Sequence, residues 1–132
     1  MGVDRVSVCG CGVDLVDIER IKRIRERFGL RFLGKVFTQA EREYCLARPN
    51  PDESLAARFA AKEAVAKALG LGLGQFCWQD IEIIRPQQGG PQVKLAGGCR
   101  AQAQAMDLDR VFVSLSHGRR QALAQAIAVR KG

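Results

Sequence analysis

The sequence predicts an α+β domain in which helices pack against a small antiparallel sheet. Helical patterns fill most of the first half of the chain, where apolar residues recur every three or four positions. The second half carries short alternating segments separated by turn residues, as antiparallel strands do. No internal repeat or linker divides the 132 residues, so we expect a single domain over residues 1–132.

Composition is ordinary for a soluble globular protein, with 47% hydrophobic and 27% charged residues. No apolar run is long enough to span a membrane, and the N-terminal residues lack a secretory signal pattern. We therefore expect a cytoplasmic protein with no membrane partner. The five cysteines are irregularly spaced, which favours free buried thiols over a metal site.

The first predicted element is a short buried strand over residues 6–13, where β-branched and small residues alternate with glycines. Asp14 follows it directly. A helix comes next, with Asp17 as its N-cap and Gly29 at its end. One face of this helix is apolar and another is basic. The apolar face holds Ile18, Ile21, Ile24 and Phe28, and the basic face Arg20, Arg23 and Arg27.

Two more helices follow. The capping box Thr38-Gln39-Ala40-Glu41 opens the first, and the turn Pro49-Asn50-Pro51-Asp52 ends it. Asp52 or Ser54 is expected to cap the second, an alanine-rich helix that runs into a loop with glycines at 70, 72 and 74. The alanines permit close packing against another element, although helix propensity alone favours the same residues.

After the glycine loop, residues 81–84 and 93–95 have strand character, and residues 87–91 form a hairpin turn between them. A short helix is expected over 100–106, and residues 111–116 alternate as a strand. The segment 121–130 is ambiguous, because its alanines favour a helix while its period of two favours a strand. We predict a strand that pairs with 111–116 through a turn at Gly118.

The alanine-rich helix carries the main candidate site residues. Glu63 and Lys67 lie one turn apart, so a carboxylate and an ammonium share one face. Asp14 supplies a second carboxylate from another element, and two carboxylates with phosphate oxygens suit Mg²⁺. The glycines let backbone N–H groups approach a ligand, but their pattern is neither a P-loop nor a dinucleotide fingerprint. These residues indicate a phosphate and metal site, while a surface ion pair and a helix-capping aspartate stay open alternatives. His117, after a strand, is either a third site residue or a turn histidine.

The net charge of +7 indicates an acidic partner or ligand. Seven basic residues gather in one early stretch: Arg20, Lys22, Arg23, Arg25, Arg27, Arg31 and Lys35. Such a segment binds nucleic acid, a membrane surface or an acidic protein, or it is only a solvated helix face. A basic nucleic-acid-binding domain is the alternative function, but it gives Asp14 and Glu63 no role and the chain has few aromatic residues for base stacking.

Several motifs together resemble bacterial holo-acyl-carrier-protein synthases. The opening motif of that family is similar to residues 12–21, Gly-Val-Asp-Leu-Val-Asp-Ile-Glu-Arg-Ile. Its second signature is similar to residues 58–68, which contain Lys-Glu-Ala and Lys67. Residues 79–83, the Gly-x-Pro turn at 89–91 and the strand 113–117 match as well. The match runs in order over nearly the whole chain, with about ten extra residues at the N-terminus.

This resemblance implies a phosphopantetheinyl transferase fold and a trimer with active sites between subunits. It implies transfer of 4′-phosphopantetheine from coenzyme A to a serine of apo acyl carrier protein, with Mg²⁺ and release of 3′,5′-ADP, in fatty acid biosynthesis. No nucleic-acid partner is implied. The acidic carrier would then explain the basic early helix.

The resemblance also implies residue roles. Asp14 and Glu63 match the Mg²⁺ ligands, and Lys67 matches a lysine that contacts the phosphates; we expect these three to be catalytic. Glu63 is the candidate base, directly or through a water, or it is a metal ligand only. The expected coenzyme A contacts are Arg58, Lys67, His117, Gly70 and Gly72, and the expected carrier contacts are Arg20, Arg27 and Arg48.

Two features depart from the family pattern. Leu71 stands where typical members have a threonine between two glycines, so only backbone contacts are expected from this loop. Arg119 and Arg120 follow His117 and Gly118, adding positive charge that suits a phosphate or only faces solvent.

Overall fold

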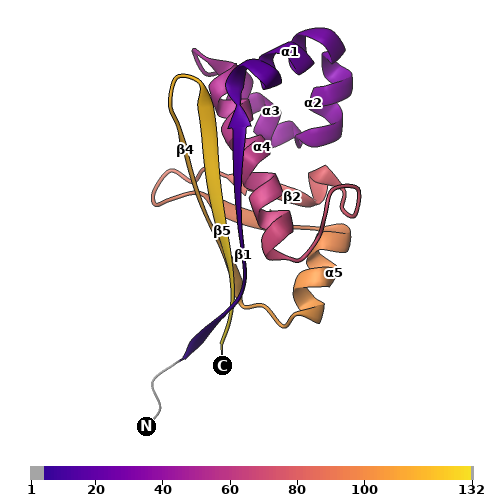
Figure 1. The fold of residues 1–132 in the computed structure, drawn as a ribbon, viewed down its shortest axis with the longest axis vertical. Coiled ribbons are helices and arrows are strands. Elements are labelled where there is room, and N and C mark those ends of the chain that lie inside the picture. Colours follow the sequence, from indigo (N-terminus) through magenta and orange to yellow (C-terminus); the bar gives the residue numbers. More distant parts are fainter. Residues whose placement is uncertain (1–4, 132) are drawn as a thin grey trace.

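The computed structural model describes residues 5–131 and has the predicted α+β architecture (Figure 1). In chain order the elements are β1 (Val6–Asp17), α1 (Ile18–Phe28), α2 (Leu30–Val36), α3 (Gln39–Leu46), α4 (Pro51–Ala68), a 3₁₀ turn η1 (Trp78–Asp80), β2 (Ile81–Ile84), β3 (Gln92–Leu95), α5 (Gly97–Ala105), β4 (Arg110–His117) and β5 (Gln121–Lys131). Three long strands form one antiparallel sheet, and β2 and β3 form a separate hairpin.

The main sheet has the strand order β1-β5-β4, so the last strand of the chain lies at its centre. The predicted strand over the alanine-rich tail is confirmed, and it pairs with β4 through a two-residue turn closed by a hydrogen bond from Gly118 N to Gln121 O (2.9 Å). Its second partner, β1, pairs with it over eleven positions, and Asp14 lies opposite Ala124.

Helix α4 packs closely against this sheet because small residues meet at the contact. Strand β5 contributes four fully buried alanines at positions 122, 124, 126 and 128. Beside them, a Cβ added at Gly10 would lie 2.1 Å from Ala68 O, and one added at Gly12 would lie 2.1 Å from Ala64 O. Only glycine therefore lets the helix backbone pass over β1 at this separation, and the close packing expected from the alanines is confirmed.

Helices α1, α2 and α3 cover the upper end of α4 (Figure 1). Arg25 of α1 forms a bidentate ion pair with Asp52 of α4, at 2.6 Å from Nε to Oδ1 and 2.9 Å from Nη2 to Oδ2. The predicted capping box of α3 is confirmed: Thr38 Oγ1 accepts from Glu41 N (3.3 Å), and Glu41 Oε1 accepts from Thr38 N (3.0 Å).

A buried ion pair joins α3 and α4 to the β2 hairpin. Lys62 and Glu41 are almost fully buried, and Lys62 Nζ lies 2.6 Å from Glu41 Oε1. The same ammonium donates to the carbonyls of Trp78 (3.0 Å) and Ile81, while Glu41 Oε2 accepts from Ile83 N (3.0 Å). Burial lowers the pKa of Lys62, and Glu41 opposes that shift. Sequence analysis found the capping role of Glu41 but not its partner Lys62.

Several predicted boundaries were wrong. Strand β1 continues to Asp17, because its pairing with β5 extends that far, so Asp14 lies within the strand rather than after it. Helix α4 begins at Pro51 with Asn50 at the N-cap position, not with a cap from Asp52 or Ser54. Pro51 suits the first helical position, since its missing N–H would have no partner there.

Two helices also differ from the prediction. Helix α2 was not predicted, because it is only seven residues long and Gly34 interrupts its apolar pattern. Helix α5 begins at Gly97 rather than at residue 100, and Asp80 Oδ2 accepts from Gly98 N (3.2 Å) at its start. Asp17 does occupy the N-cap position of α1, but its carboxylate caps no backbone N–H.

Over the residues that the structure describes, no helix combines the length and apolarity required to cross a membrane. The cytoplasmic location and the single-domain organisation stay predictions.

Candidate active site

Strand β1 and helix α4 bring Asp14, Glu63 and Lys67 together. Alternate residues of β1 face α4, and Asp14 belongs to this inward set with Gly12 and Val16. Lys67 crosses to the strand, where its Nζ donates to Val13 O at 2.8 Å and lies 3.4 Å from Asp14 Oδ1. The Asp14 side chain is 14% exposed and that of Lys67 is 51% exposed, so the cluster opens to solvent on the lysine side.

The two carboxylates interact strongly. Partial burial raises the pKa of Glu63 to about 7, and the neighbouring charge of Asp14 adds to the rise. Lys67 and Arg20 act in the opposite sense. Asp14 Oδ2 is buried and has no hydrogen-bond donor. The two carboxylates therefore oppose each other's ionisation even beside Lys67 and Arg20, and a bound cation would relieve that repulsion.

A metal would find two protein ligands here. Over residues 5–131, no group of three or more histidine, cysteine, aspartate or glutamate side chains is placed to hold a metal. Mg²⁺ commonly takes one or two carboxylates and fills its other positions with water and phosphate oxygens. The pair Asp14 and Glu63, with the unpartnered Asp14 Oδ2, fits that ligand set.

The glycine loop is less open than the sequence suggests. Gly70 N donates to Lys67 O (3.0 Å), and Gly72 N donates to the side-chain Oε1 of Gln75 (2.5 Å). Both amides are therefore engaged within the chain, and ligand contacts at these two glycines stay a prediction. A small hollow of about 60 Å³ beside Glu63 and Lys67 is instead walled by apolar side chains, those of Leu71, Leu73 and Phe76.

A larger cleft of about 520 Å³ lies at the other end of α4. Four side chains that carry or can carry positive charge line it: Arg48, Arg58, Arg85 and His117. Its other polar lining comes from Tyr44, Asn50, Glu53, Ser54 and Ser116. His117 Nδ1 lies 3.6 Å from Glu53 Oε2. This composition suits an anionic ligand with hydroxyl or amide groups.

Arg58 is the built-in cation of this cleft, because it is only 6% exposed. Its guanidinium lies 4.1 Å from the centre of the Tyr44 ring, and its Nη1 donates to Ser54 Oγ at 3.3 Å. Arg58 Nε is buried without an acceptor. A buried charged donor with a free N–H is costly unless a ligand accepts from it. Arg58 is therefore prepared for an anion.

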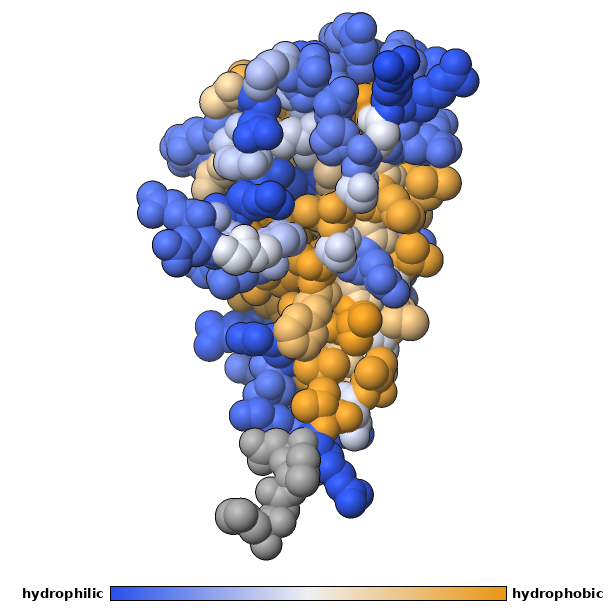
Figure 2. All heavy atoms as spheres, turned by 90° about the vertical axis from the view of Figure 1, so that its left-hand side faces the viewer, coloured by the Kyte–Doolittle hydropathy of each residue, from blue (hydrophilic) through white to orange (hydrophobic). Residues whose placement is uncertain are grey.

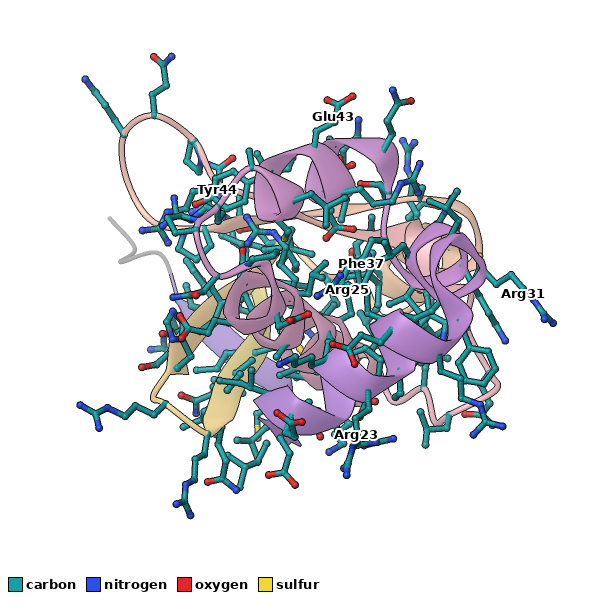
Figure 3. All side chains as sticks on the ribbon, turned by 90° about the horizontal axis from the view of Figure 1, so that it is seen from above. Arg23, Arg25, Arg31, Phe37, Glu43 and Tyr44 are labelled. Atoms are coloured by element: carbon teal, nitrogen blue, oxygen red, sulfur yellow. The ribbon has the colours of Figure 1, made fainter. Side chains whose placement is uncertain are left out.

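The structure separates the predicted site residues into three places. Asp14, Glu63 and Lys67 form the first cluster, and Arg58 and His117 line the cleft. Arg20 and Arg27 are exposed on α1, where Arg27 also lies 5.2 Å from the Phe28 ring. Figure 3 shows the neighbouring Arg23 and Arg31 extending outward from α1 and α2. Arg48 lines the cleft, and its expected contact with the carrier stays a prediction.

Sequence analysis missed two residues of the cleft, Arg85 and Tyr44. Arg85 comes from the segment that follows β2, and Tyr44 comes from α3. Neither stands in a motif whose spacing announces a ligand. Only the folding of α3 and the hairpin around Arg58 brings them together, with Arg48 also stacked 5.3 Å from the Tyr44 ring.

Comparison with known proteins identifies the family of this chain. The family model of the 4′-phosphopantetheinyl transferase superfamily matches residues 10–126. A holo-acyl-carrier-protein synthase of Moorella thermoacetica is 52% identical over 116 residues, which cover 88% of this chain and 90% of that protein.

Solved structures share the fold of this chain. A holo-acyl-carrier-protein synthase of Neisseria meningitidis superposes with a TM-score of 0.84 at 32% identity, covering 92% of this chain and 98% of that one. One of Helicobacter pylori, in complex with coenzyme A, gives 0.79 at 28% identity, covering 89% and 98%. The match of the family model over nearly the whole chain, the identity to these relatives and the shared fold show that the chain belongs to the 4′-phosphopantetheinyl transferase superfamily.

Proposed function

We propose that this chain transfers 4′-phosphopantetheine from coenzyme A to a serine of apo acyl carrier protein and releases 3′,5′-ADP. The relatives named as holo-acyl-carrier-protein synthases support the reaction, and the related structure with coenzyme A supports the donor. The observation that carries the proposal is the cluster of Asp14, Glu63 and Lys67, where two carboxylates and a lysine meet at a partly open surface. We place the reaction in fatty acid biosynthesis.

The chemistry needs little beyond positioning and charge neutralisation. A bond forms between the serine oxygen and the β-phosphorus of coenzyme A, and the bond from that phosphorus to the bridging oxygen of the 3′,5′-ADP leaving group breaks. Lys67 offsets the negative charge of the phosphates. The serine proton must leave, and Glu63, whose pKa is raised to about 7, is poised to take it near neutral pH.

Asp14 and Glu63 would hold a Mg²⁺ ion in this proposal. The buried Asp14 Oδ2 without a donor supports the assignment, because a cation would satisfy it. When bound, Mg²⁺ neutralises charge on the pyrophosphate. If Glu63 serves as a ligand, its proton is displaced and the base must be another group.

Calorimetric titration of Mg²⁺ into wild type and into Glu63→Gln, with coenzyme A present, separates a ligand role from a base role.

The cleft around Arg58 is the proposed site of the nucleotide and its 3′-phosphate. Arg58 supplies the buried free donor, and Arg48, Arg85 and His117 add charge around the same volume. This proposal moves Arg48 from the carrier contacts to the nucleotide contacts. Arg58→Ala should raise the coenzyme A KM with little change in the carrier KM, because removing a buried charged donor costs about 2 kcal/mol or more.

The carrier is proposed to bind the exposed basic side of α1, through Arg20 and Arg27. Arg20 also influences Glu63, so this face lies beside the catalytic cluster. An acidic carrier docked here brings its serine toward Asp14 and Glu63. Arg20→Ala should raise the carrier KM, and an unchanged carrier KM would remove Arg20 from the docking face.

We also propose that the active protein is a homotrimer with sites between subunits. The outer face of the sheet is apolar and exposed (Figure 2). Its residues include Val13 (56% exposed), Leu15 (57%), Phe112 (49%) and Leu123 (45%). Such a face usually marks an interface. Of residues 5–131, none lines both the Arg58 cleft and the Asp14 cluster, so a cleft from one copy facing a cluster from the next would complete the site.

The decisive assay incubates the protein with Mg²⁺, coenzyme A and apo carrier, and measures the phosphopantetheine mass on the carrier. Asp14→Asn and Glu63→Gln should each lower turnover at least a hundredfold while circular dichroism stays unchanged. Glu43→Gln, an exposed carboxylate on α3, is the matched control and should retain turnover. Absence of transfer to several apo carriers would overturn the proposed function.

Subunit mixing tests the shared site. With coenzyme A held well below the raised KM of Arg58→Ala, the Arg58→Ala and Glu63→Gln chains should each show little turnover. A refolded mixture should recover about a quarter of wild-type turnover, because each site draws independently on two chains. No recovery, with mixed trimers verified by mass, would place both residues in one subunit's site. Leu15→Asp should dissociate the trimer in sedimentation experiments, whereas Leu30→Asp on α2, which is more exposed (80%) but outside the sheet, should not.

A further inference from the structure

The turn between β4 and β5 carries two arginines that the proposed function does not use. Gly118 N donates to Gln121 O, so Arg119 and Arg120 are the two loop residues of the hairpin, and both are exposed. Two-residue hairpin loops favour glycine, asparagine and aspartate. Turn formation therefore does not explain a pair of arginines at this position.

The turn is fixed to the start of α1. Ile18 N, at the first position of the helix, donates to Arg120 O at 2.8 Å. Next to it, the side-chain amide of Gln121 donates to Asp17 Oδ1 at 3.3 Å. Figure 1 shows the turn at the same end of the sheet as the start of α1. These hydrogen bonds fix the turn relative to α1, so the backbone positions of Arg119 and Arg120 are defined.

A groove of about 440 Å³ lies between the turn and the helix. Arg119 and Arg120 line it from the turn, and Arg23 lines it from α1. Asp17 and Glu19 also border it, so three arginines stand against two carboxylates, and the Asp17 carboxylate accepts a hydrogen bond from Gln121. Among residues 5–131, none of the three arginines takes part in an ion pair. The groove lining therefore keeps a net positive charge, and its arginines are not held in ion pairs.

We propose that Arg23, Arg119 and Arg120 form a second docking point for the acidic carrier, which extends the α1 surface across the hairpin turn. The inference rests on the proposed function, because it concerns the same carrier. A protein surface fits the groove better than a small anion does, since the arginines are exposed and spread over two elements. In the Arg58 cleft, by contrast, the guanidinium of Arg58 is buried, which suits a small phosphate group. Exposed charges of this kind chiefly raise the association rate.

The test compares Arg119→Glu/Arg120→Glu with the control Arg100→Glu/Arg130→Glu. Both pairs are exposed, both change the net charge equally, and the control residues lie on α5 and near the end of β5. Binding is measured by fluorescence anisotropy of labelled apo carrier, and turnover by transfer of phosphopantetheine. The milder variant Arg119→Gln/Arg120→Gln removes the charges without reversing them, and it keeps the test possible if the double reversal misfolds.

We expect the carrier Kd of the Arg119/Arg120 reversal to rise about tenfold over that of the control at about 50 mM salt, and the difference to shrink at about 300 mM. The glutamine variant should show about a third of that rise. A carrier Kd equal to that of the control would overturn the proposal. A rise in the coenzyme A KM instead of the carrier Kd would also overturn it and assign the groove to a small phosphate.

The two hypotheses fail differently. If wild-type protein binds apo carrier through this turn but transfers nothing, the proposed function fails and the docking point stands. If wild-type protein transfers phosphopantetheine but both charge reversals bind carrier equally, the docking point fails alone.

Discussion

Breaking the buried pair of Lys62 and Glu41 should destabilise the protein more than any exposed charge change. Two oxygens of Glu41 accept from three donors, namely Lys62 Nζ, Thr38 N and Ile83 N. In Glu41→Gln only one oxygen remains, so the new amide group must face at least one of these donors. In Lys62→Met the carboxylate stays buried without its counter-charge, and the carbonyls of Trp78 and Ile81 lose their donor.

The magnitudes follow from this geometry. Removing one partner of a buried ion pair costs about 3 to 5 kcal/mol. Glu41→Gln keeps part of the hydrogen bonding and should cost about 3 kcal/mol, while Lys62→Met strands a charge and should cost about 4 kcal/mol. The double variant has no stranded charge. It should therefore cost about 5 kcal/mol, less than the two single changes together, with a coupling of about 2 kcal/mol.

Urea unfolding followed by circular dichroism measures these free energies, and the Tm of Glu41→Gln should fall by about 10 °C. Gln39→Ala, an exposed change on the same helix, serves as the control and should alter stability by less than about 0.5 kcal/mol. Single changes that each cost under about 1 kcal/mol, or a strictly additive double variant, would refute the role given to this pair.

Two further predictions concern packing and thiols. Gly12→Ala should cost about 3 kcal/mol of unfolding free energy in urea titrations, because the new Cβ would lie 2.1 Å from Ala64 O. Gly34→Ala has open space within helix α2 and should stabilise by about 0.5 kcal/mol; equal effects would contradict the close helix–strand contact. Burial raises the pKa of Cys99 from 9.0 to about 11, so at pH 8 it should resist thiol reagents that label the exposed Cys11. Since the folded pKa is the higher one, the stability that Cys99 contributes is full below pH 9 and is lost between pH 9 and about 11, which pH-dependent unfolding checks against Cys99→Ala.

Several parts of the fold could be predicted from patterns of neighbouring residues. The capping box at Thr38 is confirmed, and Glu63 and Lys67 border the same small hollow, because both features depend on residues three or four positions apart. The family resemblance is confirmed by the family model and by close relatives. The alanine-rich tail was decided correctly as a strand because its alternation outweighed its helix propensity.

Long-range arrangement could not be predicted in the same way. The Arg58 cleft collects side chains from α3, α4, β4 and the segment after β2, and no sequence spacing encodes how these elements meet. The engagement of Gly72 N by Gln75 likewise depends on the folded loop. The pair of Lys62 and Glu41 was missed for the same reason, since Glu41 lies on another helix and the carbonyl acceptors of Lys62 lie sixteen and nineteen residues away along the chain.

The central place of β5 has a consequence for how the protein is made. Strand β1 emerges from the ribosome well before its partner β5, which follows it by more than a hundred residues. Until then β1 has an open edge on the nascent chain, and the carboxylate of Asp14 has no sheet to hold it against α4. Pairing across more than a hundred residues also makes loop closure the slow part of folding. Active protein should thus appear only after β5 has emerged, and chains that stop within β5 should be aggregation-prone rather than weakly active.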